Sequence, residues 1–354
     1  MKFYPIKIAT IRRETSDCIS IALDIPDDLK EVFRYSPGQY LTFRASLNGE
    51  EVRRSYSLCS APSDREWRVA VKKVDGGLFS TYANEHLRAG DILETAPPEG
   101  RFFPDSLSVN TGLDYVFFAA GSGITPVISI IKTVLEHAPG CRVTLVYGNR
   151  RSSTVIFREE IEGLKNRYLG RFQVIHILSQ ERVDVPWQSG RITTARLDEM
   201  LEVMPELLNA NQYFLCGPEE MIACVREGLQ SRGVPKDHVH FELFGTGQQK
   251  HKKSQQPVSD AVVATAEIRL DGVWFDVPVR EGQAVLDAAL ATGADLPFAC
   301  KGGVCCTCRA KLTEGKVEMD ANYALDEEEV EAGFILTCQA HPLTPVIKVD
   351  FDIK

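Results

Sequence analysis

Four cysteines near the C-terminus constrain the fold more than any other feature of this chain. Cys300, Cys305 and Cys308 follow the spacing C-x4-C-x2-C, and Cys338 stands alone further along the chain. This is the ligand spacing of plant-type [2Fe–2S] clusters, in which four thiolates hold two irons. Zinc also takes four thiolates and is the alternative, although zinc sites favour two similar short cysteine pairs. The spacing therefore predicts a [2Fe–2S] domain in a chain that moves single electrons.

Length and composition indicate a multidomain globular protein. The chain has 354 residues, of which 44% are hydrophobic and 25% charged, which favours two or three domains. No apolar run reaches the length that spans a bilayer, and the N-terminus alternates like a strand rather than a signal peptide. Scattered cysteines in apolar segments are typical of a reducing cytosol. We therefore predict a cytoplasmic protein with no membrane partner.

The charge of the chain is concentrated at its C-terminal end. The formal net charge is −9, and the segment Ala261–Lys354 holds sixteen acidic and eight basic residues. A basic footprint for nucleic acid is absent, so we expect no nucleic-acid partner. An acidic domain favours docking to a basic patch on a protein partner, which speeds encounter. Surplus acid that only aids solubility is the other interpretation.

Three patterns follow one another along the chain. Residues 1–108 show short alternating runs with turn signals, which predicts an antiparallel β-barrel interrupted by a helix at 78–87. Residues 109–245 alternate strands with helices, which predicts a parallel, doubly wound α/β sheet. A polar, basic linker at 246–261 leads to the cluster domain at 262–354, in which Asp271-Gly272 predicts a hairpin.

The barrel contains two segments suited to a flavin. A flavin needs an aromatic wall, a hydroxyl or backbone donor near N5, and a cation for its phosphates; Tyr56, Ser57 and Arg54 can supply these. A glycine turn that opens a helix can bind phosphate through free N–H groups. A strand tyrosine that is only core, and a turn that is only a turn, are the alternatives. The candidate FAD residues are Arg54, Ser55, Tyr56, Ser57, Val71, Lys72, Gly76, Gly77, Leu78 and Ser80.

The α/β segment contains two strand ends suited to a nicotinamide dinucleotide. Gly121 and Gly123 follow a strand and let a pyrophosphate approach the backbone, and Thr125, before Pro126, can hydrogen-bond it. A later strand ends in Cys216-Gly217-Pro218, at the edge where open α/β sheets bind ligands. The Cys216 thiol can lie against a nicotinamide ring, and a buried cysteine that only closes a strand is the alternative.

The residues after the second strand predict which nicotinamide dinucleotide is used. An acidic residue there would favour NAD, whereas arginines with hydroxyls favour a 2′-phosphate. The segment is Asn149-Arg150-Arg151-Ser152, and no acidic residue follows until Glu159. We therefore predict NADPH as donor, with NADH possible and exposed arginines without a ligand as the alternative.

These motifs together resemble the ferredoxin–NADP reductase-like flavoproteins. The matching segments, in the order that family uses, are Arg54-x-Tyr56-Ser57, Gly77-x-x-Ser80, Gly121-x-Gly123-Ile-Thr125-Pro126, Cys216-Gly217-Pro218 and the C-terminal cysteines. The resemblance covers essentially the whole chain. It implies a flavin barrel, a nicotinamide domain and a β-grasp [2Fe–2S] domain, with electrons passing from NADPH through FAD to the cluster.

Within that family the chain resembles the reductase components of bacterial phenylacetyl-CoA epoxidases. The segments that carry this are Tyr147–Arg150, Asp295–Cys305 and Asn322–Ala340. The resemblance implies that the oxygenase subunits of a multicomponent di-iron epoxidase are the partner. Reductases of other oxygenases, hydroxylases or cluster proteins share the domain order and stay an alternative, as does a zinc-stapled interaction module without enzymatic activity.

The same resemblance implies three catalytic residues. Ser57 and Cys216 are expected where hydride passes from nicotinamide to flavin, and Glu242 is expected to cover the flavin ring together with Phe244. Related cluster loops often carry a small residue where this chain has Cys306. Cys306 cannot ligate iron without displacing a neighbouring ligand, so we interpret it as a structural neighbour of the cluster.

Overall fold

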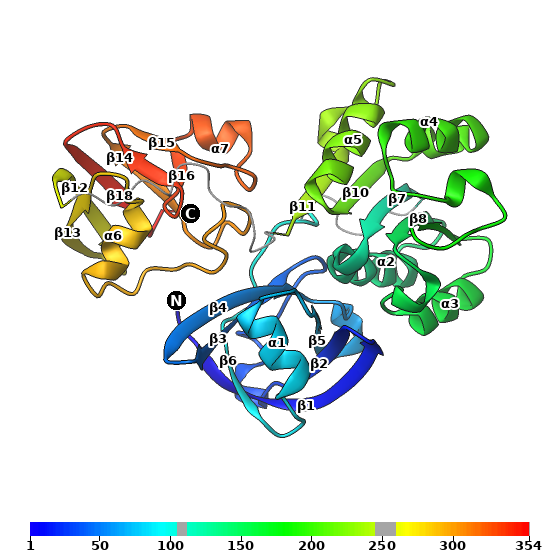
Figure 1. Cartoon of the computed structure of the whole chain (residues 1–354), viewed down its shortest axis with the longest axis horizontal. Helices are drawn as coiled ribbons and strands as arrows, with labels where there is room; N and C mark the ends of the chain where they lie inside the picture. Colours follow the sequence, from blue (N-terminus) through cyan, green and yellow to red (C-terminus); the bar gives the residue numbers. More distant parts are fainter. Residues whose placement is uncertain (105–111, 245–259, 354) are drawn as a thin grey trace. The chain divides into compact units, whose positions relative to one another are not determined.

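The computed structural model describes residues 1–104, 112–244 and 260–353 (Figure 1). The chain divides into two compact units, each described by itself below. One unit holds the barrel and the nicotinamide domain; the other holds the C-terminal domain with Met1–Lys2 and Arg53–Ser55. The predicted boundary at 108/109 and most of the predicted linker at 246–261 lie outside the described residues, so the domain limits stay predictions.

An antiparallel β-barrel forms the N-terminal part of the chain. Its strands are β1 (Tyr4–Thr15), β2 (Cys18–Asp24), β3 (Tyr40–Leu47), β4 (Glu50–Ser57), β5 (Trp67–Lys72) and β6 (Ile92–Thr95). They pair in the order β4-β3-β6-β1-β2-β5, and a bridge between Leu58 and Val69 joins the two ends of that order. Helix α1 (Leu78–Glu85) buries Phe79 and Ala83 in the barrel core. The predicted barrel with one helix is confirmed.

A parallel five-stranded sheet forms the nicotinamide domain. Its strands are β7 (Asp114–Ala120), β8 (Arg142–Asn149), β9 (Phe172–Leu178), β10 (Gln212–Gly217) and β11 (Val239–Leu243), and its helices are α2 (Ile124–His137), α3 (Arg158–Arg167), α4 (Thr194–Val203) and α5 (Glu219–Gln230). The spatial order is β11-β10-β7-β8-β9. The chain therefore reverses direction across the sheet between β7 and β10, which is where open α/β sheets bind ligands.

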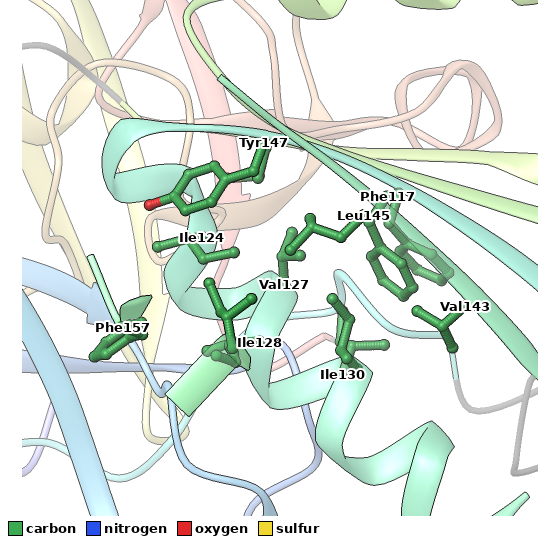
Figure 2. Packing of buried hydrophobic residues seen from close by; sticks show 14 of the residues in the cluster. Phe117, Ile124, Val127, Ile128, Ile130, Val143, Leu145, Tyr147 and Phe157 are labelled. Atoms are coloured by element: carbon green, nitrogen blue, oxygen red, sulfur yellow. The ribbon is translucent and has the colours of Figure 1, made fainter. Parts of the chain in front are cut away.

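Helices cover both faces of this sheet because the strands are apolar on both sides. Phe117 and Leu145 point to the face covered by α2 and α3, whereas Phe118 and Val146 point to the face covered by α4 and α5. Figure 2 shows the α2 side chains lying against those of β7 and β8. This alternation fixes the register of each strand, and with it the position of the residues that follow.

A mixed sheet with a short helix forms the C-terminal domain. Its elements are β12 (Val262–Leu270), β13 (Val273–Arg280), α6 (Val285–Ala291), β14 (Arg309–Glu314), β15 (Val317–Met319), α7 (Glu327–Glu331), β16 (Phe334–Leu336), β17 (Ala340–Pro342) and β18 (Val346–Asp350). The main sheet has the order β13-β12-β18-β14-β16, with β12 and β18 parallel. Asp271 and Gly272 form the predicted hairpin turn, both with positive φ, as a tight hairpin requires. The β-grasp fold is confirmed.

Short 3-10 turns complete the described elements. They are η1 (Asp27–Leu29), η2 (Pro62–Asp64), η4 (Gly121–Gly123), η5 (Ser152–Thr154), η6 (Pro186–Gln188), η7 (Pro205–Asn209) and η8 (Lys236–His238). Two of them, η4 and η5, follow directly after β7 and β8 at the carboxyl edge of the parallel sheet. They place two of the three predicted nicotinamide segments at one edge of one sheet.

Candidate functional site

Ser57, Cys216 and Glu242 come together from three strands. The Ser57 hydroxyl, at the end of β4, donates a hydrogen bond to a carboxyl oxygen of Glu242 at 3.2 Å. Glu242 on β11 is the register partner of Cys216 on β10. Burial raises the pKa of Glu242 to about 8, and burial beside Glu242 raises the pKa of the Cys216 thiol well above its usual value. At neutral pH these are therefore a neutral carboxyl and a neutral thiol beside a hydroxyl.

Tyr56 lies in an aromatic cluster beneath the end of β4. Its ring centroid is 5.6 Å from that of Phe79 and 6.0 Å from that of Phe43, and both pairs are tilted. Tyr56 itself is half-buried, so the ring is fixed by packing and still partly accessible. A flavin ring would find a rigid aromatic wall here. Arg54 on the same strand is exposed, and Ser55 is half-buried.

The glycine turn before α1 is held by Ser80. The buried Ser80 hydroxyl accepts a hydrogen bond from the Val74 N–H at 3.1 Å and donates to the Gly77 carbonyl at 3.3 Å. No described side chain caps the first N–H groups of α1, which begins at Leu78, so these donors are available to a phosphate. Val71 is buried in the barrel core, and only its backbone can face a ligand.

Lys72 and Gly121 bring the two predicted phosphate-binding segments together. A Cβ placed on Gly121 would lie 4.0 Å from the Lys72 Nζ and within 4 Å of no other described atom beyond its chain neighbours. Gly121 has φ +55°, a conformation that other residues avoid. Its carbonyl accepts a hydrogen bond from the buried Tyr147 hydroxyl at 2.9 Å. The Tyr147 hydroxyl therefore holds the Gly121 turn in place, and the other side of the turn is open beside the Lys72 ammonium group.

Gly123 lies against the end of β10. A Cβ there would be 2.0 Å from the Cys216 carbonyl oxygen, so only glycine allows α2 to begin this close to the strand. The buried Thr125 hydroxyl donates to the Ser122 carbonyl at 3.0 Å. Pro126, in the first turn of α2, needs no N–H partner. Gly217 ends β10 and Pro218 precedes α5, so the second predicted segment meets the first at the sheet's reversal point.

The Asn149–Ser152 segment has a partner that the sequence reasoning missed. The carboxylate of Glu181 accepts hydrogen bonds from the Ser152 N–H at 2.7 Å and from the Ser152 hydroxyl at 3.0 Å. These bonds lower the pKa of Glu181. Arg150 and Arg151 are exposed. Asn149 itself is buried.

The four predicted cluster cysteines form two pairs. Cys300 shares a hydrogen bond with Cys305, and Cys308 shares one with Cys338. Among residues 1–104, 112–244 and 260–353, no three histidine, cysteine or acidic side chains converge as the ligands of one ion. A zinc ion needs all four sulfurs around a single centre, whereas a two-iron cluster needs two sulfurs on each iron. The two pairs agree with the two sulfurs that each iron of a [2Fe–2S] cluster requires.

Neighbouring polar groups position these pairs. The Gly302 N–H donates to the Cys300 Sγ at 3.3 Å. The Thr337 N–H and hydroxyl both donate to the Cys308 carbonyl, at 3.1 and 3.0 Å, which holds Cys338 beside Cys308. The Gln339 amide donates to the Cys338 Sγ at 3.4 Å. Such donors stabilise thiolate ligands. Thr337 and Gln339 carried no signal in the sequence beyond their place beside Cys338.

Cys306 contacts a backbone carbonyl of a neighbouring segment. Its thiol donates to the Ala324 carbonyl at 3.0 Å, and its backbone has φ +51°. A cysteine in the left-handed region is strained, which gives a physical reason for a small residue at this position. The interpretation of Cys306 as a structural residue agrees with this contact.

Three family models match successive parts of the chain. An oxidoreductase FAD-binding domain matches residues 5–103, an oxidoreductase NAD-binding domain matches residues 117–227, and a 2Fe-2S iron-sulfur cluster binding domain matches residues 268–343. The matches follow the predicted order of flavin, nicotinamide and cluster domains. FAD, a [2Fe–2S] cluster and a nicotinamide dinucleotide are therefore the groups for which these domains are built.

One curated relative matches almost the whole chain. It is a subunit of the 1,2-phenylacetyl-CoA epoxidase of Escherichia coli (strain K12), 41% identical over 353 residues, covering 99% of this chain and 98% of that protein. This chain belongs to the family of phenylacetyl-CoA epoxidase reductase components. The match spans all three domains, and this protein is accordingly a flavin and iron–sulfur oxidoreductase.

Another curated relative and two solved structures are also similar to this chain. A 3-ketosteroid-9-alpha-monooxygenase ferredoxin reductase component of Rhodococcus rhodochrous is 37% identical, covering 98% of this chain and 96% of that protein. The phthalate dioxygenase reductase structure is 22% identical with a TM-score of 0.59, covering 99% and 98%. An intact type IV self-sufficient cytochrome P450 monooxygenase has a TM-score of 0.69 at 22% identity, and this chain spans 41% of it. The two structures show a shared fold.

No helix within the described ranges is long and apolar enough to cross a membrane.

Proposed function

We propose that this chain passes electrons from NADPH, through FAD and a [2Fe–2S] cluster, to the oxygenase subunits of a di-iron epoxidase that acts on phenylacetyl-CoA. The observation that carries the proposal is the 41% identity with the epoxidase component of Escherichia coli, which extends over nearly the full length of both chains. FAD supplies the chemistry that links a two-electron donor to a one-electron acceptor. A cytoplasmic location agrees with ten cysteines that are all free thiols in the described structure.

We propose a role for each residue at and near the point where the strand order of the sheet reverses. Ser57, Cys216 and Glu242 would line the place where nicotinamide meets flavin, and the raised pKa values of Cys216 and Glu242 keep both groups neutral there. Tyr56 would pack against the flavin ring, and Lys72 would neutralise phosphate beside Gly121. The four paired cysteines would hold the two irons.

The NADPH preference rests on Arg150 and Arg151. Both guanidinium groups are exposed after β8, where a Rossmann-like sheet reads the adenosine ribose. Arginine binds phosphate by paired hydrogen bonds. These two residues would therefore attract the 2′-phosphate that distinguishes NADPH from NADH.

A second acceptor is supported by the 37% identity with the 3-ketosteroid-9-alpha-monooxygenase reductase component. In that case the chain would serve another oxygenase with the same flow of electrons. The acceptor therefore has to be tested directly.

The test mixes the purified chain with phenylacetyl-CoA epoxidase oxygenase subunits and measures NADPH oxidation and epoxide formation, with and without phenylacetyl-CoA. The proposal predicts NADPH consumption that depends on phenylacetyl-CoA and matches the epoxide formed. Dye reduction without such coupling would refute the epoxidase as acceptor and leave the ketosteroid-type oxygenase as the next candidate.

A further inference from the structure

We propose that Glu181 sets the choice between NADPH and NADH, because it occupies the donors on Ser152 that a 2′-phosphate would use. This inference rests on the proposed function, since it concerns the same nicotinamide site. It names a specificity-determining residue that lies in a different loop from the arginines after β8.

The backbone fixes Glu181 at this position. Strands β8 and β9 pair in parallel up to Asn149 and Leu178. The ladder continues beyond the strands, because the Ser179 N–H donates to the Asn149 carbonyl at 2.9 Å and the Gln180 N–H donates to the Arg150 carbonyl at 2.8 Å. The next residue, Glu181, is thereby held beside Ser152.

The carboxylate of Glu181 occupies the donors of Ser152 that face it. It accepts from the Ser152 N–H at 2.7 Å, and both of its oxygens lie 3.0 Å from the Ser152 hydroxyl. Glu181 is thus an internal anion in the place where an external anion would bind.

The charges around Glu181 determine how its carboxylate competes with a 2′-phosphate for the donors of Ser152. The hydrogen bonds from Ser152 have the largest effect on the pKa of Glu181 and lower it, and the guanidinium groups of Arg151 and Arg158 lower it further. The carboxylate therefore stays ionised at neutral pH. A 2′-phosphate brings negative charge to the same donors and must displace Glu181 against its repulsion. The 2′-hydroxyl of NADH can instead donate a hydrogen bond to the carboxylate.

The structure therefore holds two opposing determinants at one edge of the sheet. Arg150 and Arg151 favour the 2′-phosphate, and Glu181 opposes it. Glu181 reduces the preference for NADPH and allows NADH to be used. Removal of its charge, with its shape kept, should release Ser152 to the phosphate.

The experiment compares the wild type with Glu181→Gln in the FAD- and cluster-loaded protein. We expect the ratio of kcat/KM for NADPH to kcat/KM for NADH, in dye reduction, to rise about tenfold, which corresponds to the loss of one like-charge contact. Glu206→Gln, an exposed position in the separate turn η7, is the matched control and should leave the ratio unchanged.

Ser152 provides a second variant. In the double variant Glu181→Gln/Ser152→Ala the gain for NADPH should shrink, because the hydroxyl released by the first change is absent. A gain in the double variant as large as in Glu181→Gln alone would show that Ser152 is not the group for which carboxylate and phosphate compete, and would overturn the inference.

Binding gives a readout that does not depend on turnover. Calorimetry with adenosine 2′,5′-bisphosphate and with 5′-AMP should show about tenfold tighter binding of the bisphosphate to Glu181→Gln and no such gain for 5′-AMP. Equal affinities for the bisphosphate in wild type and variant would overturn the inference. If neither NADPH nor NADH supports dye reduction by the wild type, the proposed function fails, and the binding comparison still decides the role of Glu181.

Discussion

The Ser57 hydroxyl donates a hydrogen bond to a carboxyl oxygen of Glu242 at 3.2 Å, and so joins the last residue of barrel strand β4 to the edge strand β11 of the parallel sheet. The two residues are 185 positions apart in the chain. Glu242 is partly buried; burial raises its pKa to about 8, whereas the hydrogen bond from Ser57 lowers it. Burial therefore favours a neutral carboxyl beside Cys216 at the point where the two cofactor-binding domains meet.

The raised pKa of Glu242 predicts a pH-dependent stability. The pKa in the folded state lies above the usual value of 4.5, so this carboxyl contributes stability that is fully present below pH 4.5 and is lost as pH rises through about 8. Between pH 6 and pH 9 we expect the wild type to lose about 2 kcal/mol that Glu242→Gln does not lose. Calorimetric melting of both proteins at the two pH values measures this. Parallel pH profiles would mean that Glu242 is not buried as a neutral acid.

Gly123 is predicted to tolerate no side chain. In Gly123→Ala the new Cβ would meet the Cys216 carbonyl oxygen at 2.0 Å, and overpacking against backbone should cost about 3 kcal/mol. Gly163 in α3 is the matched control, since its Cβ would meet nothing within 4 Å among the described atoms; Gly163→Ala should be neutral or stabilise by about 0.5–1 kcal/mol. Melting temperatures of the two variants test the contrast. A Gly123→Ala protein as stable as Gly163→Ala would contradict the close approach of α2 to β10.

Cys306 is predicted to be a strained structural residue rather than an iron ligand. Both Cys306→Ala and Cys306→Gly lose the thiol contact with the Ala324 carbonyl, but only glycine relieves the positive φ of +51°. Cys306→Gly should therefore be more stable than Cys306→Ala by about 1 kcal/mol. Both should keep two irons per chain and an unchanged visible spectrum. Loss of iron in both variants would identify Cys306 as a ligand.

Substitution of Cys305 is predicted to stop electron transfer through the cluster while hydride transfer to the flavin continues. Cys305→Ser removes one partner of the Cys300–Cys305 pair, so the cluster should be lost while the barrel and the nicotinamide domain stay intact. NAD(P)H-driven reduction of a hydride-accepting dye should continue, and reduction of a one-electron protein acceptor should stop. Cys306→Ser is the control and should keep both activities. Loss of both activities in Cys305→Ser alone would contradict the order in which flavin precedes cluster.

Local signals made much of this protein predictable. The cysteine spacing, the Asp271-Gly272 turn and the Gly121-x-Gly123 turn each depend on residues close in sequence. The helix predicted at 78–87 is α1 (Leu78–Glu85). Helix α4 gives a weak apolar pattern in the sequence, because only Leu197, Met200 and Leu201 are buried on it. Strand β11 gives a weak signal because it is a short edge strand.

Contacts between distant segments were harder to predict. Glu242 entered the site only through the family resemblance, because nothing in its own sequence neighbourhood points to Ser57. Glu181 is not apparent from the sequence near Asn149, because it follows the next strand, β9, rather than β8. The parallel pairing of β8 with β9 brings it there from the next strand. The carboxyl ends of neighbouring parallel strands meet at one edge, so the following loop is where such a residue should be sought.

An anaerobic titration of the purified protein with NADPH, followed by absorbance and electron paramagnetic resonance, tests the central claim most directly. FAD takes two electrons and the cluster one, so the account predicts bleaching of both chromophores, complete at roughly 1.5 NADPH per chain, with the signal of a reduced [2Fe–2S] cluster. Flavin bleaching at about one NADPH, without that signal and with zinc in place of iron, would contradict it.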